Sequence, residues 1–193
     1  MDIFIAIHGF TLLIISTLLY QDNAAGKRRH LVVRSQSQDR FRWIYLFIKI
    51  AVPFGLLSVL FRNVTPQLLI LFENIALQIT GIVCSTLGIL IFIWAKRTLG
   101  KNYSPCFDVR LPQRIVVEGP YAYVRHPIYT ANLFVLGGLS LSTGSLFLIA
   151  SFALTLAYYL KSAKVEEREL LINFPSYAEL IHRTGRFFPK FVR

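Results

Sequence analysis

Charged residues are scarce in this chain of 193 residues, where Asp, Glu, Lys and Arg together make up 16% of the sequence. In soluble domains these residues account for about a quarter of the sequence, so the shortage argues against a soluble globular protein. Hydrophobic residues account for 54% of the chain. The net charge of +11 would suggest a nucleic-acid partner in a soluble protein. Here we expect it to mark one face of a membrane, and we expect no nucleic-acid partner.

Cysteines are also few, and the motifs of soluble enzymes are missing. Of the two cysteines, Cys84 lies in an apolar run and Cys106 in a polar loop, so we expect no disulfide. The sequence has no glycine-rich dinucleotide fingerprint, no Walker A loop, no H-E-x-x-H and no Cys or His pairs at metal-ligand spacing. These absences disfavour a soluble cofactor fold, and we expect no metal site.

Long apolar runs are abundant, and they predict an all-α fold: an integral membrane helical bundle in a single domain, residues 1–193. A spanning helix needs about 20 apolar residues. About five segments fit, namely Ile3–Tyr20, Trp43–Phe61, Leu68–Trp94 and the two arms of a C-terminal helical hairpin within Ala131–Leu160. The hairpin turn is predicted at Ser142–Ser145. The N-terminal spans then occupy residues 1–62, and a catalytic core occupies residues 68–193.

Basic residues fall mainly in three segments: between the first two spans, between the third span and the hairpin, and after the last span. An odd number of spans places all three on one side of the bilayer, and the positive-inside rule makes that side the cytoplasm. The first run follows Asp2 without a basic stretch, which favours a retained span over a signal peptide. We therefore expect a multi-pass protein with a cytoplasmic C-terminal helix. Its membrane would be the endoplasmic reticulum in a eukaryote or the plasma membrane in a prokaryote.

Two cytoplasmic segments gather polar residues against this apolar background. Residues 110–129 hold three tyrosines and three prolines, and His126-Pro127 stands where a helix would begin. Glu166 and Glu167 follow the last span, within the C-terminal segment 161–193. Each feature also has an ordinary explanation: the histidine as a helix cap, the tyrosines as an interfacial aromatic belt, and the glutamates as a solvated first helical turn. Taken alone, the residues leave open whether these features are structural or form a functional site.

A longer pattern includes both segments. Residues 118–129 read Glu-Gly-Pro-Tyr-Ala-Tyr-Val-Arg-His-Pro-Ile-Tyr. This stretch resembles the signature G-x-Y-x-x-x-R-H-P-x-Y of the isoprenylcysteine carboxyl methyltransferase family and of its phospholipid methyltransferase relatives. The second part follows in order, with Glu166-Glu167, Leu170-Leu171, Phe174, Tyr177 and Thr184–Pro189. The resemblance extends from about residue 85 to residue 193.

The resemblance implies S-adenosylmethionine as methyl donor, bound at the cytoplasmic face between the motif loop and the C-terminal segment. By position, the implied cofactor-binding residues are Gln113, Arg114, Ile115, Val116, Tyr121, His126, Pro127, Tyr129 and Glu166. The implied catalytic residues are His126, Glu167 and Arg125. Isoprenylcysteine enzymes carry an arginine four residues before the cofactor glutamate. Here that position is Ser162, so its neighbours Lys161 and Lys164 become the expected substrate-binding residues.

The acceptor implied by the resemblance is a lipophilic molecule among membrane lipids, either a small molecule or a prenylated substrate. A carboxylate is already ionised and needs no base, so a carboxylate acceptor giving a methyl ester is the first hypothesis. A phospholipid amine is the alternative; it must lose a proton, and Glu167 or His126 would be the candidate base. Sterol reductases share a similar R-H-P-x-Y motif, so an NADPH-dependent reductase is a third hypothesis. A non-enzymatic membrane scaffold with a degenerate motif is a fourth.

Overall fold

The computed structural model describes residues 1–21, 38–61, 69–100 and 115–190. Within these ranges the chain is helical, with no strand beyond two isolated β-bridges. The helices are α1 (Asp2–Gln21), α2 (Gln38–Leu60), α3 (Ile75–Leu99), the short 3₁₀ helix η4 (Gly119–Ala122), α4 (Pro127–Thr143), α5 (Leu146–Asn173) and α6 (Tyr177–Arg183). The predicted all-α fold is confirmed.

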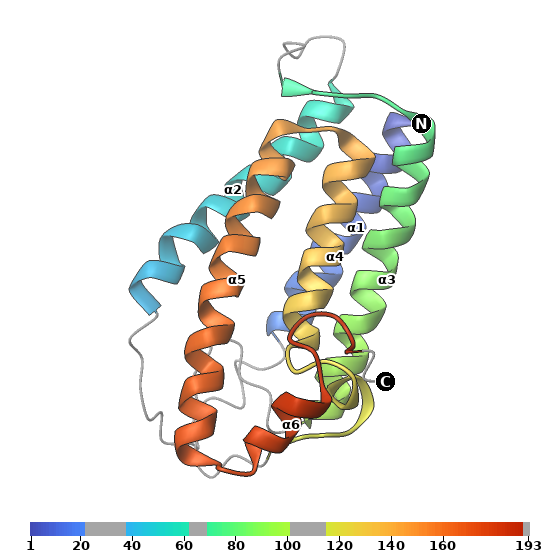
Figure 1. Ribbon diagram of the computed structural model, residues 1–193. Coiled ribbons are helices and arrows are strands. Elements are labelled where there is room, and N and C mark those ends of the chain that lie inside the picture. Colours follow the sequence, from blue (N-terminus) through green and yellow to red (C-terminus); the bar gives the residue numbers. More distant parts are fainter. Residues whose placement is uncertain (22–37, 62–68, 101–114, 191–193) are drawn as a thin grey trace.

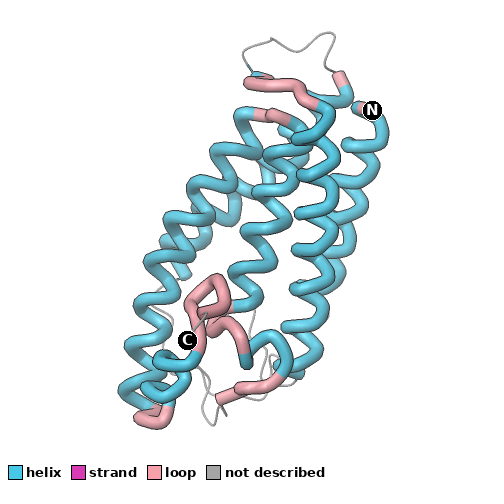
Figure 2. The backbone as a smooth tube through the Cα atoms, turned by 45° about the vertical axis from the view of Figure 1, so that its right-hand side comes forward, coloured by secondary structure: helices cyan, strands magenta, loops and turns pink. Residues whose placement is uncertain are grey.

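The five long helices run side by side as a bundle (Figure 1). α5 is the longest, with 28 residues, and its C-terminal part reaches well beyond the ends of α1 and α2 (Figure 1). η4, α6 and nearby loops gather at this end, close to the last turns of α3 and the first turn of α4. The N-terminus lies at the opposite end, as Figure 2 also shows. One end of the bundle therefore carries a cap of short helices and loops.

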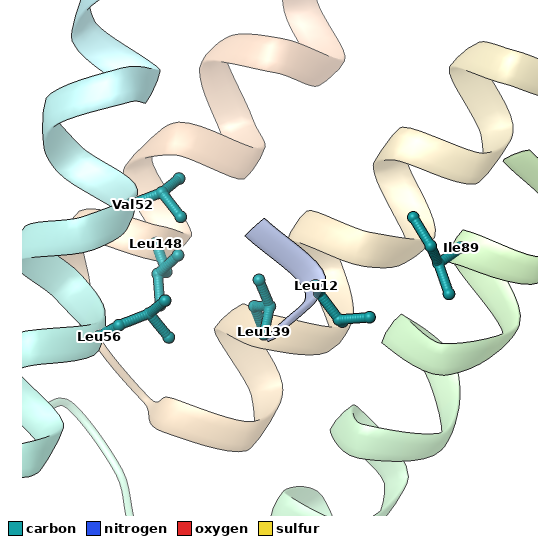
Figure 3. Close-up of a cluster of buried hydrophobic side chains, with 6 residues drawn as sticks. All are labelled: Leu12, Val52, Leu56, Ile89, Leu139 and Leu148. Carbon is teal, nitrogen blue, oxygen red and sulfur yellow. The ribbon is translucent and has the colours of Figure 1, made fainter. Parts of the chain in front are cut away.

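α4 lies at the centre of the bundle, and none of its residues is exposed. One cluster of buried apolar side chains joins it to the other four long helices (Figure 3): Leu12, Val52, Leu56, Ile89, Leu139 and Leu148. The large apolar side chains that are exposed on the long helices belong to α1, α2, α3 and α5. In a bilayer, lipid tails would cover them. Interior and exterior are thus both apolar, so close packing has to hold the helices together.

Three helices are long and apolar enough to cross a membrane: Asp2–Leu19 in α1, Ile75–Leu99 in α3, and Leu146–Asn173 in α5. The apolar part of α2, Leu46–Leu60, is shorter, and α4 has 17 residues. The chain is therefore a helical membrane protein. Three of the five predicted spans meet this criterion of length and composition.

α3 and α4 approach each other closely enough for their backbones to touch. A Cβ atom added to Gly138 would lie 2.5 Å from both the carbonyl oxygen of Gly81 and the amide nitrogen of Ser85. A Cβ atom added to Gly88 would lie 2.7 Å from the amide nitrogen of Val135. Small residues at such positions allow membrane helices to pack by van der Waals contact. These glycines hold the central helix against α3.

The hairpin between α4 and α5 turns at Gly144 and Ser145, inside the predicted stretch Ser142–Ser145. Gly144 has a left-handed φ of 63°, and its N–H donates to the carbonyl of Ser140. Glycine adopts this conformation without the steric cost that a side chain would add, and it commonly ends helices in this way. The turn signal in the sequence thus marks a helix C-cap.

The third helix begins later than predicted, at Ile75 rather than at Leu68, a residue outside the described ranges. The side chain of Asn74 caps this helix, because its Oδ1 accepts hydrogen bonds from the N–H groups of Ala76 and Leu77 at 2.9 and 3.2 Å. The apolar run continues upstream of the cap, so hydropathy alone placed the start too early.

The last long helix continues past its predicted apolar end at Leu160 and reaches Asn173 without interruption. Many of the residues after Leu160 are good helix formers, so the change from apolar to charged residues does not end the helix. Glu166 and Glu167 consequently lie on α5 itself. Their positions are fixed by the same rigid element that packs among the apolar helices.

Substitution of two adjacent glycines by alanine tests the α3–α4 contact. In Gly138→Ala the methyl group would meet backbone atoms of α3, whereas in Gly137→Ala it would lie 3.2 Å from the side chain of Phe152. We expect Gly138→Ala to lower stability in detergent by about 1–3 kcal/mol through overpacking. Gly137→Ala should leave stability unchanged or raise it, since alanine favours a helix over glycine by about 1 kcal/mol. Thermal unfolding followed by circular dichroism measures both, and equal losses would contradict the close contact.

Candidate functional site

The arginine-histidine-proline motif lies at the start of α4. Pro127 is the first helical residue and is buried, a position that suits a ring lacking an N–H. His126 is the N-cap residue, but its side chain makes no capping hydrogen bond. Its ring lies instead beside the carboxylates of Glu166 and Glu167 on α5. Helix capping therefore does not account for this histidine.

The segment after α6 folds back onto the motif. We call residues 184–187 the C-terminal strap. The N–H of Arg125 donates to the carbonyl of Gly185 at 2.9 Å, and the N–H of His126 donates to the carbonyl of Arg186 at 3.1 Å. The two halves of the sequence pattern are therefore joined by backbone pairing, although they are far apart along the chain.

Glu167 is the centre of a buried charge cluster. The residue is 5% exposed, and its Oε1 accepts a hydrogen bond from Nε of Arg125 at 2.8 Å. Nε of Arg186 donates to both carboxylate oxygens at 3.1 Å, and Nη2 of the same residue donates to Oε2. A carboxylate removed from water needs such partners. We call Arg125, Glu167 and Arg186 the carboxylate clamp, which ties the motif and the strap to α5.

His126 lies between two carboxylates. Its Nδ1 is 3.6 Å from Oε2 of Glu166, and its Nε2 is 3.3 Å from Oε1 of Glu167. The side chain of Glu166 is 31% exposed, whereas that of Glu167 is 7% exposed. Of the two carboxylates, Glu166 is thus the one that a ligand can reach from solvent.

A stack of aromatic rings leads from His126 into the bundle. The ring of Tyr129 lies nearly parallel to the imidazole, with 5.1 Å between the ring centroids. Tyr159 of α5 stacks in turn on Tyr129, with 4.3 Å between the centroids. The hydroxyl of Tyr129 donates to Oε2 of Glu166 at 3.0 Å. Phe187 of the strap lies 6.1 Å from His126. The stack therefore connects the glutamates with the α4–α5 interface.

Two polar side chains of α4 hold members of this stack. Nδ2 of Asn132 donates to the hydroxyl of Tyr159 at 2.8 Å. The hydroxyl of Thr130 donates to the carbonyl of Phe187, 57 residues away in sequence, at 2.8 Å. Sequence reasoning assigned no role to any of these four residues. One signal was present, since Tyr159 precedes Glu166 by seven residues, about two full turns, which places both on nearly the same helical face.

Burial and the glutamates raise the pKa of two nearby tyrosines. For Tyr121 of η4, burial has the larger effect and the charge of Glu166 adds to it. For Tyr177, the first residue of α6, burial again comes first, followed by the charges of Glu167 and Glu166. Both hydroxyls therefore remain protonated near neutral pH. The hydrogen bond with Glu167 raises the pKa of Arg186, which secures the charge of the clamp.

The structure brings five of the predicted site residues together. Those in mutual contact are Arg125, His126, Tyr129, Glu166 and Glu167. Tyr121 lies near enough to Glu166 for that charge to affect it. Ile115 and Val116 are partly buried residues ahead of η4. The predicted donor-binding residues Gln113 and Arg114 lie outside the described ranges.

Lys161 and Lys164, the predicted substrate-binding residues, are both exposed on α5. Lys161 follows Tyr159 by two residues, which is about 200° around the helix, so it lies on the side away from the aromatic stack. The structure therefore does not place Lys161 beside the stack, and a role for these lysines in substrate binding stays a prediction.

Comparison with known proteins finds a family and two relatives. The family model described as phospholipid methyltransferase matches residues 76–175, which include the motif at Arg125 and the glutamates of α5. The cobalt-zinc-cadmium resistance protein CzcN of Cupriavidus metallidurans is 42% identical over 77 residues, or 39% of this chain and 36% of the relative. The nickel-cobalt-cadmium resistance protein NccN of Alcaligenes xylosoxydans xylosoxydans is 37% identical over 82 residues, or 42% of this chain and 38% of the relative. The matched segments thus span less than half of each relative.

Replacement of Glu167 tests the carboxylate clamp. Glu167→Gln leaves two arginine side chains without their anionic partner in a buried place, and breaking such a group costs about 3–5 kcal/mol. We expect a clear drop in the thermal unfolding midpoint in detergent. The matched control is Glu179→Gln, because Glu179 pairs with Arg183 on the surface, where both side chains are mostly exposed and a pair contributes little. A drop of the same size in both variants would rule out the clamp as a special stabilising feature.

Proposed function

Because the chain belongs to the phospholipid methyltransferase family, we propose that it transfers a methyl group from S-adenosylmethionine to a lipophilic acceptor in the membrane. The meeting of Tyr129, His126 and Glu166 at one end of the bundle supports this most directly, with the Tyr129 hydroxyl 3.0 Å from the Glu166 carboxylate. The motif loop, α5 and the C-terminal strap converge there. A soluble donor and a membrane-dissolved acceptor can meet at such a place.

The residues present suit this donor. S-adenosylmethionine supplies an electrophilic methyl group on a sulfonium cation, and it also carries an ammonium group and ribose hydroxyls. The partly exposed carboxylate of Glu166 can accept hydrogen bonds from such groups. The ring faces of Tyr121 and Tyr129 can stabilise a cation by cation–π contact. The buried side chains of His126 and Tyr129 keep water from one side of the site.

We assign different roles to the two glutamates. Glu167 accepts hydrogen bonds from both arginines of the clamp, so taking up a proton would weaken these charge-assisted bonds. We therefore place Arg125 and Glu167 as positioning residues. His126 and Glu166 face the reacting groups, and they are the first candidates to receive a proton if the acceptor must lose one.

We propose that all five long helices cross the membrane, with the site on the cytoplasmic side. The shorter apolar helices, α2 and α4, pack between the three long spans. Among the described residues, Lys96 and Arg97 in the last turn of α3 and Arg125 in the motif lie at the end of the bundle that carries the cap, and the positive-inside rule assigns that side to the cytoplasm. The membrane would be the plasma membrane in a prokaryote and the endoplasmic reticulum in a eukaryote.

For the acceptor, we place an amine ahead of a carboxylate, the first hypothesis from the sequence. Among the residues that the structure describes near the site, the guanidinium groups of Arg125 and Arg186 are bonded to Glu167. Lys161 and Lys164 are exposed on α5. Glu166 adds negative charge beside the aromatic stack. This balance favours a neutral or cationic nucleophile over an anionic one. A prenylated or other lipophilic carboxylate is the alternative.

Binding of S-adenosylhomocysteine to the detergent-solubilised protein tests the donor site. We expect Glu166→Gln and His126→Ala each to weaken binding about tenfold or more, the size of effect expected when a hydrogen bond to a charged group is lost. Glu169→Gln, one turn further along α5, serves as the control and should bind like the wild type. Titration with NADPH separates the reductase hypothesis. Binding of NADPH in place of S-adenosylhomocysteine would refute the proposed donor.

Labelled methyl transfer onto a panel of lipophiles tests the acceptor class. The panel contains phosphatidylethanolamine, prenylcysteines, and fatty and terpenoid acids. We expect label that resists base, as a methylated amine does, because the two guanidinium groups that the structure describes near the stack are already paired with Glu167. A base-labile product would indicate a methyl ester and restore the carboxylate hypothesis.

A further inference from the structure

The C-terminal strap reaches the interior of the site through one accessible side chain. In the carboxylate clamp the side chains of Arg125 and Glu167 are 6% and 7% exposed, whereas that of Arg186 is 32% exposed. Arg186 binds both oxygens of Glu167 through Nε and adds a bond from Nη2. A planar guanidinium that engages both oxygens fixes the orientation of a carboxylate, which a single point charge does not.

The strap also forms part of the surroundings of His126. The backbone carbonyl of Arg186 accepts a hydrogen bond from the N–H of His126. The ring centroid of the next residue, Phe187, lies 6.1 Å from that of the imidazole. The backbone carbonyl of Phe187 accepts a hydrogen bond from the hydroxyl of Thr130. Oε1 of Glu167, the bonding partner of Arg186, lies 3.3 Å from Nε2 of the same ring. The strap thus lies next to His126 through Phe187 and is linked to it through Glu167 as well.

We infer that Arg186 is a positioning residue for the methyl-donor site: it latches the strap to α5 through Glu167 and so holds His126 between Glu166 and Glu167. This inference rests on the proposed function. Arg186 has no need to touch the donor. With the latch closed, the imidazole and the carboxylates stand ready for a ligand. With the latch open, binding must first order the strap, and affinity falls because that ordering opposes binding.

The exposed arginine of α6 offers a matched comparison. Arg183 lies three residues before Arg186 and pairs with Glu179, with side chains 75% and 67% exposed. Both arginines carry one positive charge and contact one glutamate. They differ in whether that glutamate belongs to the site. A general effect of charge or of C-terminal stability would therefore appear in both, and a latch would appear only in Arg186.

The experiment measures S-adenosylhomocysteine affinity by calorimetry in lipid nanodiscs, well below the unfolding midpoint of each variant. We expect Arg186→Gln to weaken binding about tenfold or more, as loss of a charge-assisted hydrogen bond would. Arg186→Lys should fall between this variant and the wild type, because it keeps the charge and loses the fork. Arg183→Gln should match the wild type. A folded Arg186→Gln protein with unchanged affinity would overturn the inference.

Hydrogen exchange supplies a readout that simple structural stability would not move. If the strap and the donor are coupled, each must favour the other to the same extent. S-adenosylhomocysteine should therefore slow exchange in residues 184–187 of the wild type and have less effect in Arg186→Gln. Binding without any change in strap exchange would also overturn the latch. Failure of the wild type to bind S-adenosylhomocysteine at all would refute the proposed function itself, so the two failures are distinguishable.

Discussion

A buried carboxylate near the end of a membrane helix is the constraint on which the arrangement of the site depends. Glu167 cannot be removed from water without cationic partners, and its partners come from two distant parts of the chain, Arg125 in the motif and Arg186 in the strap. Satisfying this one group brings the start of α4 and the C-terminal strap to the same turn of α5. The position of His126 follows from that meeting.

The clamp needs a firm support, which the contact between α3 and α4 provides. In lipid, an apolar helix gains little by turning its side chains inward, so the helices hold together by the quality of their packing. The backbone contact at Gly81 and Gly138 locks the central helix, and the motif stands at the first turn of that helix. The two features act at different depths: glycines fix the helix among its neighbours, and charges fix the loops at its end.

Hydropathy, turn-forming residues and a proline at a helix start sufficed to predict the helical bundle, the hairpin turn at Gly144 and the helix start at Pro127. These features depend on local sequence. The role of Arg186 and the stacking of Tyr159 escaped prediction, since both depend on partners far away in the chain. A tyrosine in an apolar run looks the same whether it faces lipid or another ring. Likewise, hydropathy marks Leu160 as the end of the apolar run but not as the end of α5, because the good helix formers that follow continue the helix to Asn173.

The continuity of α5 has a mechanical consequence. The helix is continuous from Leu146 to Asn173. Its first part packs among the apolar helices, and its last part carries Glu166 and Glu167. Helices of this kind change tilt when the thickness of the surrounding bilayer changes. Because Glu166 and Glu167 lie on the same uninterrupted helix, a change of its tilt would move both carboxylates as one unit.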